Sequence, residues 1–90
     1  MEAHYTVHAA AEPQAIPRLL NYFAQQALIP SRLAAHEDGC GMVMLSIVQP
    51  GVEQHNARII AEKMRASVLV ESVALDFVSS AVPELIPVRG

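Results

Sequence analysis

The side chains best suited to chemistry in this 90-residue sequence are four histidines and one cysteine. His4 and His8 fall on one face of a predicted strand, but four residues along a strand span about 13 Å, too far to share a metal ion. His36 falls in another predicted strand, and a third strand should separate it from His8. We therefore expect no metal site and interpret these histidines as surface or interface residues.

Cys40 lies within the turn sequence Asp38-Gly39-Cys40-Gly41, where glycine supplies the positive φ that a tight hairpin needs. A catalytic thiol needs a histidine or a helix N-terminus beside it to form the thiolate, and the sequence places only His36 loosely near it. A single cysteine forms neither an internal disulfide nor a thiolate zinc site, and it excludes the CxxC pair of a copper chaperone. We interpret Cys40 as an exposed turn residue without a catalytic role.

The remaining polar residues do not assemble an active site. The glycines, at positions 39, 41, 51 and 90, make no phosphate-binding loop. Glu37 and Asp38 belong to a turn. Glu53 and Glu62 belong to the solvent face of a predicted helix, so no pair of carboxylates lies on a pocket wall. The sequence therefore predicts neither an enzyme nor a cofactor.

Charge and hydropathy exclude several classes of partner. With 6 Lys and Arg residues against 9 Asp and Glu residues, the chain has a formal net charge of −3, and its basic residues are scattered. Nucleic-acid binding depends on a basic stripe or on stacking aromatics in the central strands, so we expect no nucleic-acid partner. Polar side chains interrupt every apolar run, and the N-terminus has no basic start followed by an apolar stretch. We expect a protein that binds no membrane and works in the cytoplasm.

The hydrophobic pattern predicts six elements in the order strand-helix-strand-strand-helix-strand. Alternation indicates strands at residues 4–11, 31–37, 42–49 and 72–78, and helical spacing indicates helices at 15–27 and 52–66. Two right-handed split crossovers then give an α+β, ferredoxin-like sandwich with an antiparallel sheet of order 4-1-3-2 and both helices on one face. We assign this domain to residues 1–78 and a C-terminal tail to residues 79–90, where Pro83 and Pro87 disfavour regular structure.

The third predicted strand, central in this sheet, is apolar on both faces. One face suits packing against the helices. The other face also carries three apolar side chains, Met42, Met44 and Val48. A lone two-layer sandwich should have a polar open face, so we predict that a second copy of the chain or the C-terminal tail covers this one.

Residues 7–33 combine a strand, the turn Glu12-Pro13-Gln14, a helix that bears Leu19-Leu20 and Phe23, and the start of a second strand. This succession resembles the first half of an ACT domain, and it is most similar to the small regulatory subunits of acetolactate synthase and their stand-alone relatives. Residues 68–73 resemble the family's approach to its last strand. The resemblance extends over about residues 4–78, and it implies the same ferredoxin-like fold.

The resemblance implies a regulatory module without catalysis of its own, which joins a second copy edge to edge as a homo-oligomer and senses an amino acid. The effector would lie against the turn before the first helix, where unsatisfied N–H groups and the helix dipole attract a carboxylate. Carried over to this chain, one copy would supply Glu12, Pro13, Gln14, Ala15 and Ile16. The second copy would supply Ile29, Pro30 and Ser31. The implied protein partner is an enzyme large subunit such as the acetolactate synthase catalytic subunit.

An alternative of another class stays open: a protein-interaction or oligomerisation module of the same fold that has lost ligand binding. A ligand sensor needs space beside Gln14, which stands where many family members have glycine. An interaction module needs only an apolar surface, such as the strip of Met42, Met44 and Val48, or an edge to which a strand can add.

Overall fold

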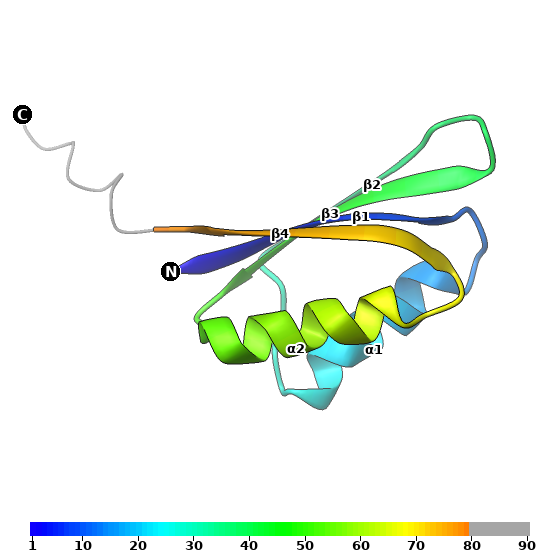
Figure 1. Cartoon of the computed structure of the whole chain (residues 1–90). Coiled ribbons are helices and arrows are strands. Elements are labelled where there is room, and N and C mark those ends of the chain that lie inside the picture. The colour runs from blue at the N-terminus through cyan, green and yellow to red at the C-terminus, as the bar shows by residue number, and fades with distance from the viewer. Residues whose placement is uncertain (80–90) are drawn as a thin grey trace, which may run out of the picture.

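The computed structural model describes residues 1–79 as a helix layer on a four-stranded sheet (Figure 1). The elements are β1 (Glu2–Ala10), α1 (Ala15–Gln25), β2 (Arg32–Glu37), β3 (Met42–Pro50), α2 (Gln54–Arg65) and β4 (Val70–Val78). The sheet has the order β2-β3-β1-β4 with antiparallel neighbours, and both helices cover the same face. The predicted ferredoxin-like fold is therefore confirmed. Of the predicted tail, residues 80–90 lie outside the described part of the chain.

Pairing across the sheet sets the ends of the strands. β1 pairs with β3 along its whole length, from Glu2 opposite Pro50 to Ala10 opposite Met42. β1 therefore begins at Glu2 rather than at residue 4, and β3 includes Pro50, which the sequence predicts to stop it. Proline is tolerated at this last position because it interrupts no ladder beyond it. β4 likewise begins at Val70 rather than at residue 72, because Val70 still pairs with Ala9 of β1.

The C-terminus of α1 is closed by a left-handed residue. Ala27 has a φ of +59°, and the helix ends at Gln25 rather than at the predicted residue 27. The Ala27 N–H donates to the Ala24 carbonyl oxygen at 2.9 Å, and the Leu28 N–H donates to the Phe23 carbonyl oxygen at 2.9 Å. These bonds resemble a Schellman cap, in which the left-handed residue is usually glycine. Alanine in this place is strained.

α2 also begins later than predicted. Gly51 has a φ of +69° and turns the chain out of β3, and Val52 is buried. Glu53 keeps an extended backbone and serves as the N-cap, so the helix begins at Gln54 rather than at residue 52. Neither helix of residues 1–79 is long and apolar enough to cross a membrane.

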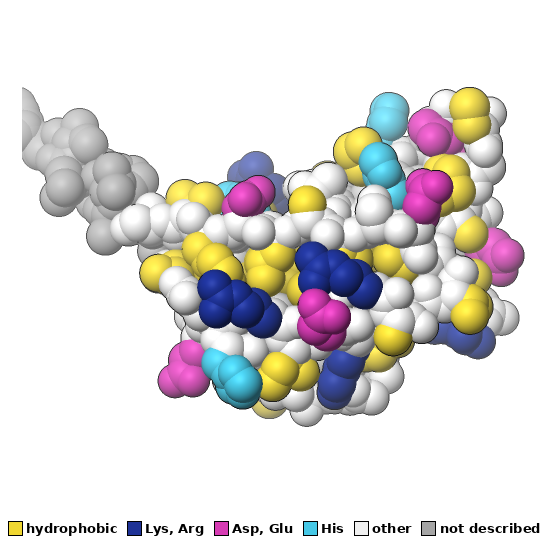
Figure 2. Space-filling model, in the orientation of Figure 1, with side chains coloured by type: hydrophobic (Ala, Val, Ile, Leu, Met, Phe, Trp, Pro, Cys, Tyr) yellow, Lys and Arg dark blue, Asp and Glu magenta, His cyan; other side chains and the backbone are white. Residues whose placement is uncertain are grey.

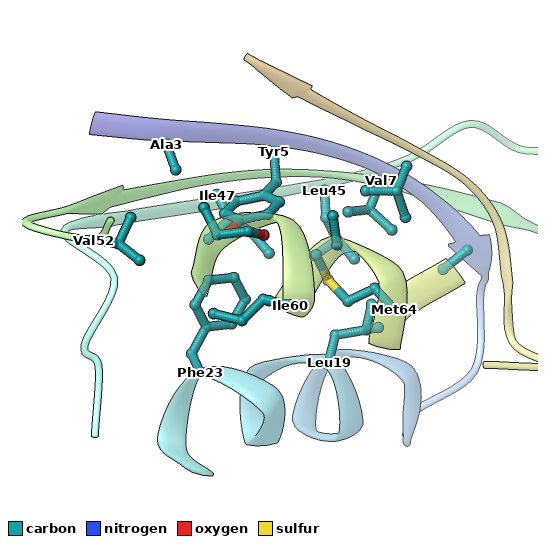
Figure 3. Close-up of a cluster of buried hydrophobic side chains, with 14 of the residues drawn as sticks. Ala3, Tyr5, Val7, Leu19, Phe23, Leu45, Ile47, Val52, Ile60 and Met64 are labelled. Atoms are coloured by element: carbon teal, nitrogen blue, oxygen red, sulfur yellow. The ribbon is translucent and has the colours of Figure 1, made fainter. Parts of the chain in front are cut away.

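The core fills the space between the sheet and the helices (Figure 3). Tyr5 and Phe23 meet edge to face, with ring centroids 5.2 Å apart and an interplanar angle of 89°. The Tyr5 hydroxyl donates a hydrogen bond of 2.9 Å to the Ala57 carbonyl oxygen, and burial raises the pKa of Tyr5 to about 12. Six other large side chains are fully buried around this pair: Val7, Leu19, Leu45, Ile47, Ile60 and Met64.

The edge strand β2 has little support from the helix layer. All six of its residues are exposed, and the β2–β3 hairpin extends past the helices in Figure 1. Its turn uses Gly39 and Gly41 at φ values of +82° and +85°. The Asp38 carboxylate accepts the Cys40 N–H at 2.7 Å, and Cys40 is exposed, as predicted.

Candidate functional site

The turn between β1 and α1 leaves two backbone N–H groups available. The Ala15 N–H donates to the Glu12 carbonyl oxygen at 3.0 Å, and Pro17 has no N–H. No side chain caps the helix start. Within residues 1–79, the N–H groups of Gln14 and Ile16 have no acceptor. Two such donors at a helix N-terminus can hold a carboxylate.

The side chains of this turn add two charges. Gln14 is exposed, and its Oε1 accepts a hydrogen bond of 3.1 Å from Arg18 Nη2. The contact directs the Gln14 side chain along the helix and holds the Arg18 guanidinium near the turn. Glu12, two residues before Gln14, is exposed. The sequence reasoning missed Arg18, although its i, i+4 spacing from Gln14 is a usable signal.

Two other loops meet this turn at one end of the sheet. The Ala11 N–H donates to Gly41 of the hairpin at 3.0 Å, and the Ala10 N–H donates to Leu69 of the α2–β4 loop at 2.8 Å. Val68, in the same loop, is 94% exposed. The backbone contacts of this loop run through Leu69, so they leave the Val68 side chain uncovered.

Residues 29–31 lie at the other end of the sheet. The Ser31 N–H donates to the Val48 carbonyl oxygen at 2.8 Å, and Val48 pairs with His4 near the start of β1. The eight steps of β1 from Glu2 to Ala10 span about 26 Å. One copy of the chain therefore does not bring residues 29–31 to the turn at 12–16, and a site that combines the two from different copies stays a prediction.

Gln49 anchors the segment before β2. Its side chain is 2% exposed, and its Nε2 donates to the carbonyl oxygens of Ile29 at 3.3 Å and Pro50 at 3.0 Å. Ile29 itself is 84% exposed. An apolar side chain so exposed is of the kind that a partner or ligand would cover. The sequence gives no indication that Gln49 fixes this segment.

The predicted partner strip lies on the open face of the sheet, the face without helices. The alternation of β3 buries Val43, Leu45 and Ile47 on the helix side, so Met42, Met44 and Val48 occupy the open side. Met44 is 43% exposed, and Met42 and Val48 are half-buried. A hollow of about 430 Å³ at the Ser31 end of this face is lined by Glu2, His4, Ser31, Arg32 and Val48.

A second hollow, of about 490 Å³, lies between α2 and the edge strand β4. Arg65 donates to the Glu62 carboxylate at 2.6 Å and to the Val73 carbonyl oxygen at 2.9 Å. The Arg58 guanidinium carbon lies 5.5 Å from the centre of the Phe77 ring. Figure 2 shows basic side chains in front of and beside a strip of hydrophobic side chains between the sheet and α2. Arg65 thus protects part of the β4 edge by occupying an outward carbonyl group.

Within residues 1–79, no three His, Cys, Asp or Glu side chains are grouped as a metal site would need. β3 separates His8 from His36, as the sequence predicts. The described residues do leave two free N–H groups at the β1–α1 turn and an exposed, helix-free face on the sheet.

The fold defines a class, a small α+β sandwich of two helices on a four-stranded antiparallel sheet. The chain belongs to the ACT-like domain family, whose profile matches residues 1–82. Small domains of this family are generally regulatory modules rather than catalysts. The nearer resemblance to acetolactate synthase small subunits stays a prediction.

Solved structures support the fold. The ACT domain of the GTP pyrophosphokinase of Chlorobium tepidum is similar with a TM-score of 0.71 and 8% identity, covering 83% of this chain and 96% of that one. The ligand-free regulatory subunit of aspartate kinase from Thermus thermophilus gives a TM-score of 0.69 and 12% identity, covering 93% of this chain and 62% of that one. The C-terminal domain of the Mycobacterium tuberculosis MgtC protein gives 0.67 and 10%, covering 83% and 84%. Among curated proteins no significant match is found.

Proposed function

We propose that this chain is a regulatory module that binds a free amino acid at the β1–α1 turn and thereby adjusts a metabolic enzyme in the cytoplasm, without catalysis of its own. The observation that carries the proposal is the pair of unpartnered N–H groups of Gln14 and Ile16. They suit the α-carboxylate, and the exposed carboxylate of Glu12 suits the α-ammonium group. An amino acid carries both charges, so it can use the N–H groups and Arg18 at its carboxylate and Glu12 at its ammonium group.

A second copy supplies the other part of the site in this proposal. The Asp38 N–H donates to the Met42 carbonyl oxygen, so the backbone N–H and C=O groups of the even-numbered residues of β2 point toward β3. The backbone N–H and C=O groups of Leu33, Ala35 and Glu37 therefore point outward, away from the sheet. β2 of a second copy can pair antiparallel with these groups. Residues 29–31 of that copy then move to the end of the sheet that carries the turn.

This arrangement gives a role to the exposed Ile29. Its side chain, together with Pro30 and Ser31 of the second copy, would cover the apolar part of the effector. We therefore place valine, leucine and isoleucine first among the candidate effectors. The acetolactate synthase catalytic subunit, an enzyme of branched-chain amino-acid synthesis, is the large subunit that we propose as the partner.

The direct test is a thermal-shift titration of the purified chain with each of the twenty amino acids. A ligand that binds only the native state raises the melting temperature in a saturable way, by linkage. We expect such a rise with one branched-chain amino acid. Addition of the chain to the acetolactate synthase catalytic subunit should then make the activity of that enzyme sensitive to the same amino acid.

The matched variants are Glu12→Gln and Glu53→Gln, which remove one exposed carboxylate before α1 and before α2, respectively. Glu12→Gln should lower the affinity for the amino acid about tenfold, because the substitution removes a charge-assisted contact with the ammonium group. Glu53→Gln should leave the affinity unchanged. No rise with any amino acid at saturating concentration contradicts the sensor and favours the alternative module that has lost its ligand.

A further inference from the structure

We propose that the open face of the sheet docks a second copy of this chain, turned by 180° about an axis parallel to the strands. The proposal goes beyond the proposed function, because the contact uses neither the β1–α1 turn nor the edge of β2. It rests on the order of the side chains in rows that cross the four strands.

The central row of this face is made of small side chains. Ala34 pairs with Ser46, Ser46 pairs with Thr6, and Thr6 pairs with Ala74, so the four residues cross the sheet from β2 to β4. All four are exposed. Their size allows a second sheet to approach closely.

The adjacent row carries opposite charges at its two ends. It runs from Arg32 through Val48 and His4 to Asp76. Arg32 and Asp76 are exposed, and within residues 1–79 the ion pairs are His4 with Glu2 and Arg65 with Glu62, which include neither of them. Three strand spacings, about 14 Å, separate Arg32 from Asp76. The two charges cannot meet within one chain.

A second copy turned about the strand axis reverses the strand order and keeps the rows in register. β2 then faces the partner's β4, and β3 faces the partner's β1. Arg32 meets the partner's Asp76, and symmetry repeats this contact on the other side. In the central row, Ala34 faces the partner's Ala74, and Ser46 faces the partner's Thr6 within reach of a hydroxyl hydrogen bond.

A turn about an axis across the strands matches less well. β2 would then face the partner's β2, with the rows inverted. Arg32 would face the partner's His36, and Asp76 would face the partner's Ser72, so neither charge would meet its opposite. The charges therefore select the axis parallel to the strands.

The shape of the face agrees with this choice. The hollow of about 430 Å³ beside Arg32 leaves space for the partner's Asp76. Met44, 43% exposed, would be covered by the partner's His8. Four strands of this length give a footprint of roughly 500 Å², below the roughly 800 Å² per partner of a typical stable interface. We therefore expect a dimer of modest affinity.

Cysteine cross-linking tests the contact and its orientation. Ala34→Cys and Ala74→Cys are made separately in a Cys40→Ser background, given distinguishable tags, mixed and treated with a short bismaleimide, because stacked sheets lie about 10 Å apart, farther than a disulfide reaches. The expected product is the mixed cross-linked dimer, because positions 34 and 74 face each other only in the stacked pair. Pairing along β2 leaves position 74 remote from the second copy, so this result is independent of the proposed function. Absence of the mixed product, or a homodimer linked through position 74, overturns the proposal.

Charge reversal tests the same contact without cysteines. Arg32→Asp and Asp76→Arg should each lower the association constant at least about fivefold in sedimentation equilibrium, because like charges then face each other. The double variant, which exchanges the two charges, should recover the association constant to within about twofold. A double variant as weak as the single variants shows that the two residues do not meet and overturns the proposal.

Discussion

The two faces of the sheet use their side chains differently. On the helix side, large apolar groups such as Tyr5 and Leu45 are buried against α1 and α2. On the open side, the rows pair small, polar and charged residues, such as Ser46 with Thr6. The helix side therefore contributes the free energy that folds the chain. The open side, whose side chains are exposed or half-buried, contributes less to folding.

The largest effect should come from the helix side. Phe23→Ala removes a fully buried ring that packs against Tyr5, and we expect it to lower the free energy of unfolding by about 3–5 kcal/mol in urea titrations. Phe23→Leu keeps most of the volume and should cost about 1–2 kcal/mol, which keeps the comparison measurable if the alanine variant does not fold. A loss below 1 kcal/mol for Phe23→Ala would contradict the division between the two faces.

The buried hydroxyl of the helix side should give a pH dependence. The folded pKa of Tyr5, about 12, exceeds the ordinary value of 10.0, so above pH 10 the unfolded chain releases a proton that the folded chain retains. The stability is complete below pH 10 and should fall by about 2–3 kcal/mol as the pH rises to 12. Tyr5→Phe is the control, and its stability should fall less over the same range. Equal slopes for the two proteins would show that Tyr5 does not cause the loss.

The end of α1 should respond in the opposite direction. Ala27→Gly relieves the left-handed backbone and should raise the free energy of unfolding by about 0.5–1 kcal/mol. Ala24→Gly, three residues earlier within the helix, is the matched control and should lower it by a similar amount, since the same substitution there removes a good helix former. Thermal denaturation of the two variants, compared with the wild-type chain, measures the increase in stability for Ala27→Gly and the decrease for Ala24→Gly.

The smallest effect should come from the open side. Met44→Ala should change the stability of the dilute chain by no more than about 0.5 kcal/mol, because the side chain is already 43% exposed. The protein concentration separates the contribution of Met44 to folding from its contribution to association. If two copies stack, the melting temperature of the wild-type chain rises with protein concentration, and that of Met44→Ala rises less. A large loss at low concentration would place Met44 in the folding core instead.

The sequence predicts the element order, the sheet order and the inward face of β1 because these depend on periodicity, and Tyr5 and Val7 are buried as that pattern indicates. The strand ends differ because they depend on pairing with distant residues, as Glu2 does with Pro50. The candidate turn follows from the resemblance, and the i, i+4 spacing of Gln14 and Arg18 would have indicated their contact.

β2 has a consequence for the time-dependent behaviour of the molecule. A strand that is exposed on both faces and bonded along one edge should open by local unfolding at a lower free energy than β1, and its amides should exchange with solvent hydrogen sooner. A second copy that pairs with or covers β2 removes this freedom in advance. A ligand that needs Ser31, the residue before β2, then meets a segment whose conformational entropy is already lost, and it binds more tightly without any change in the average structure.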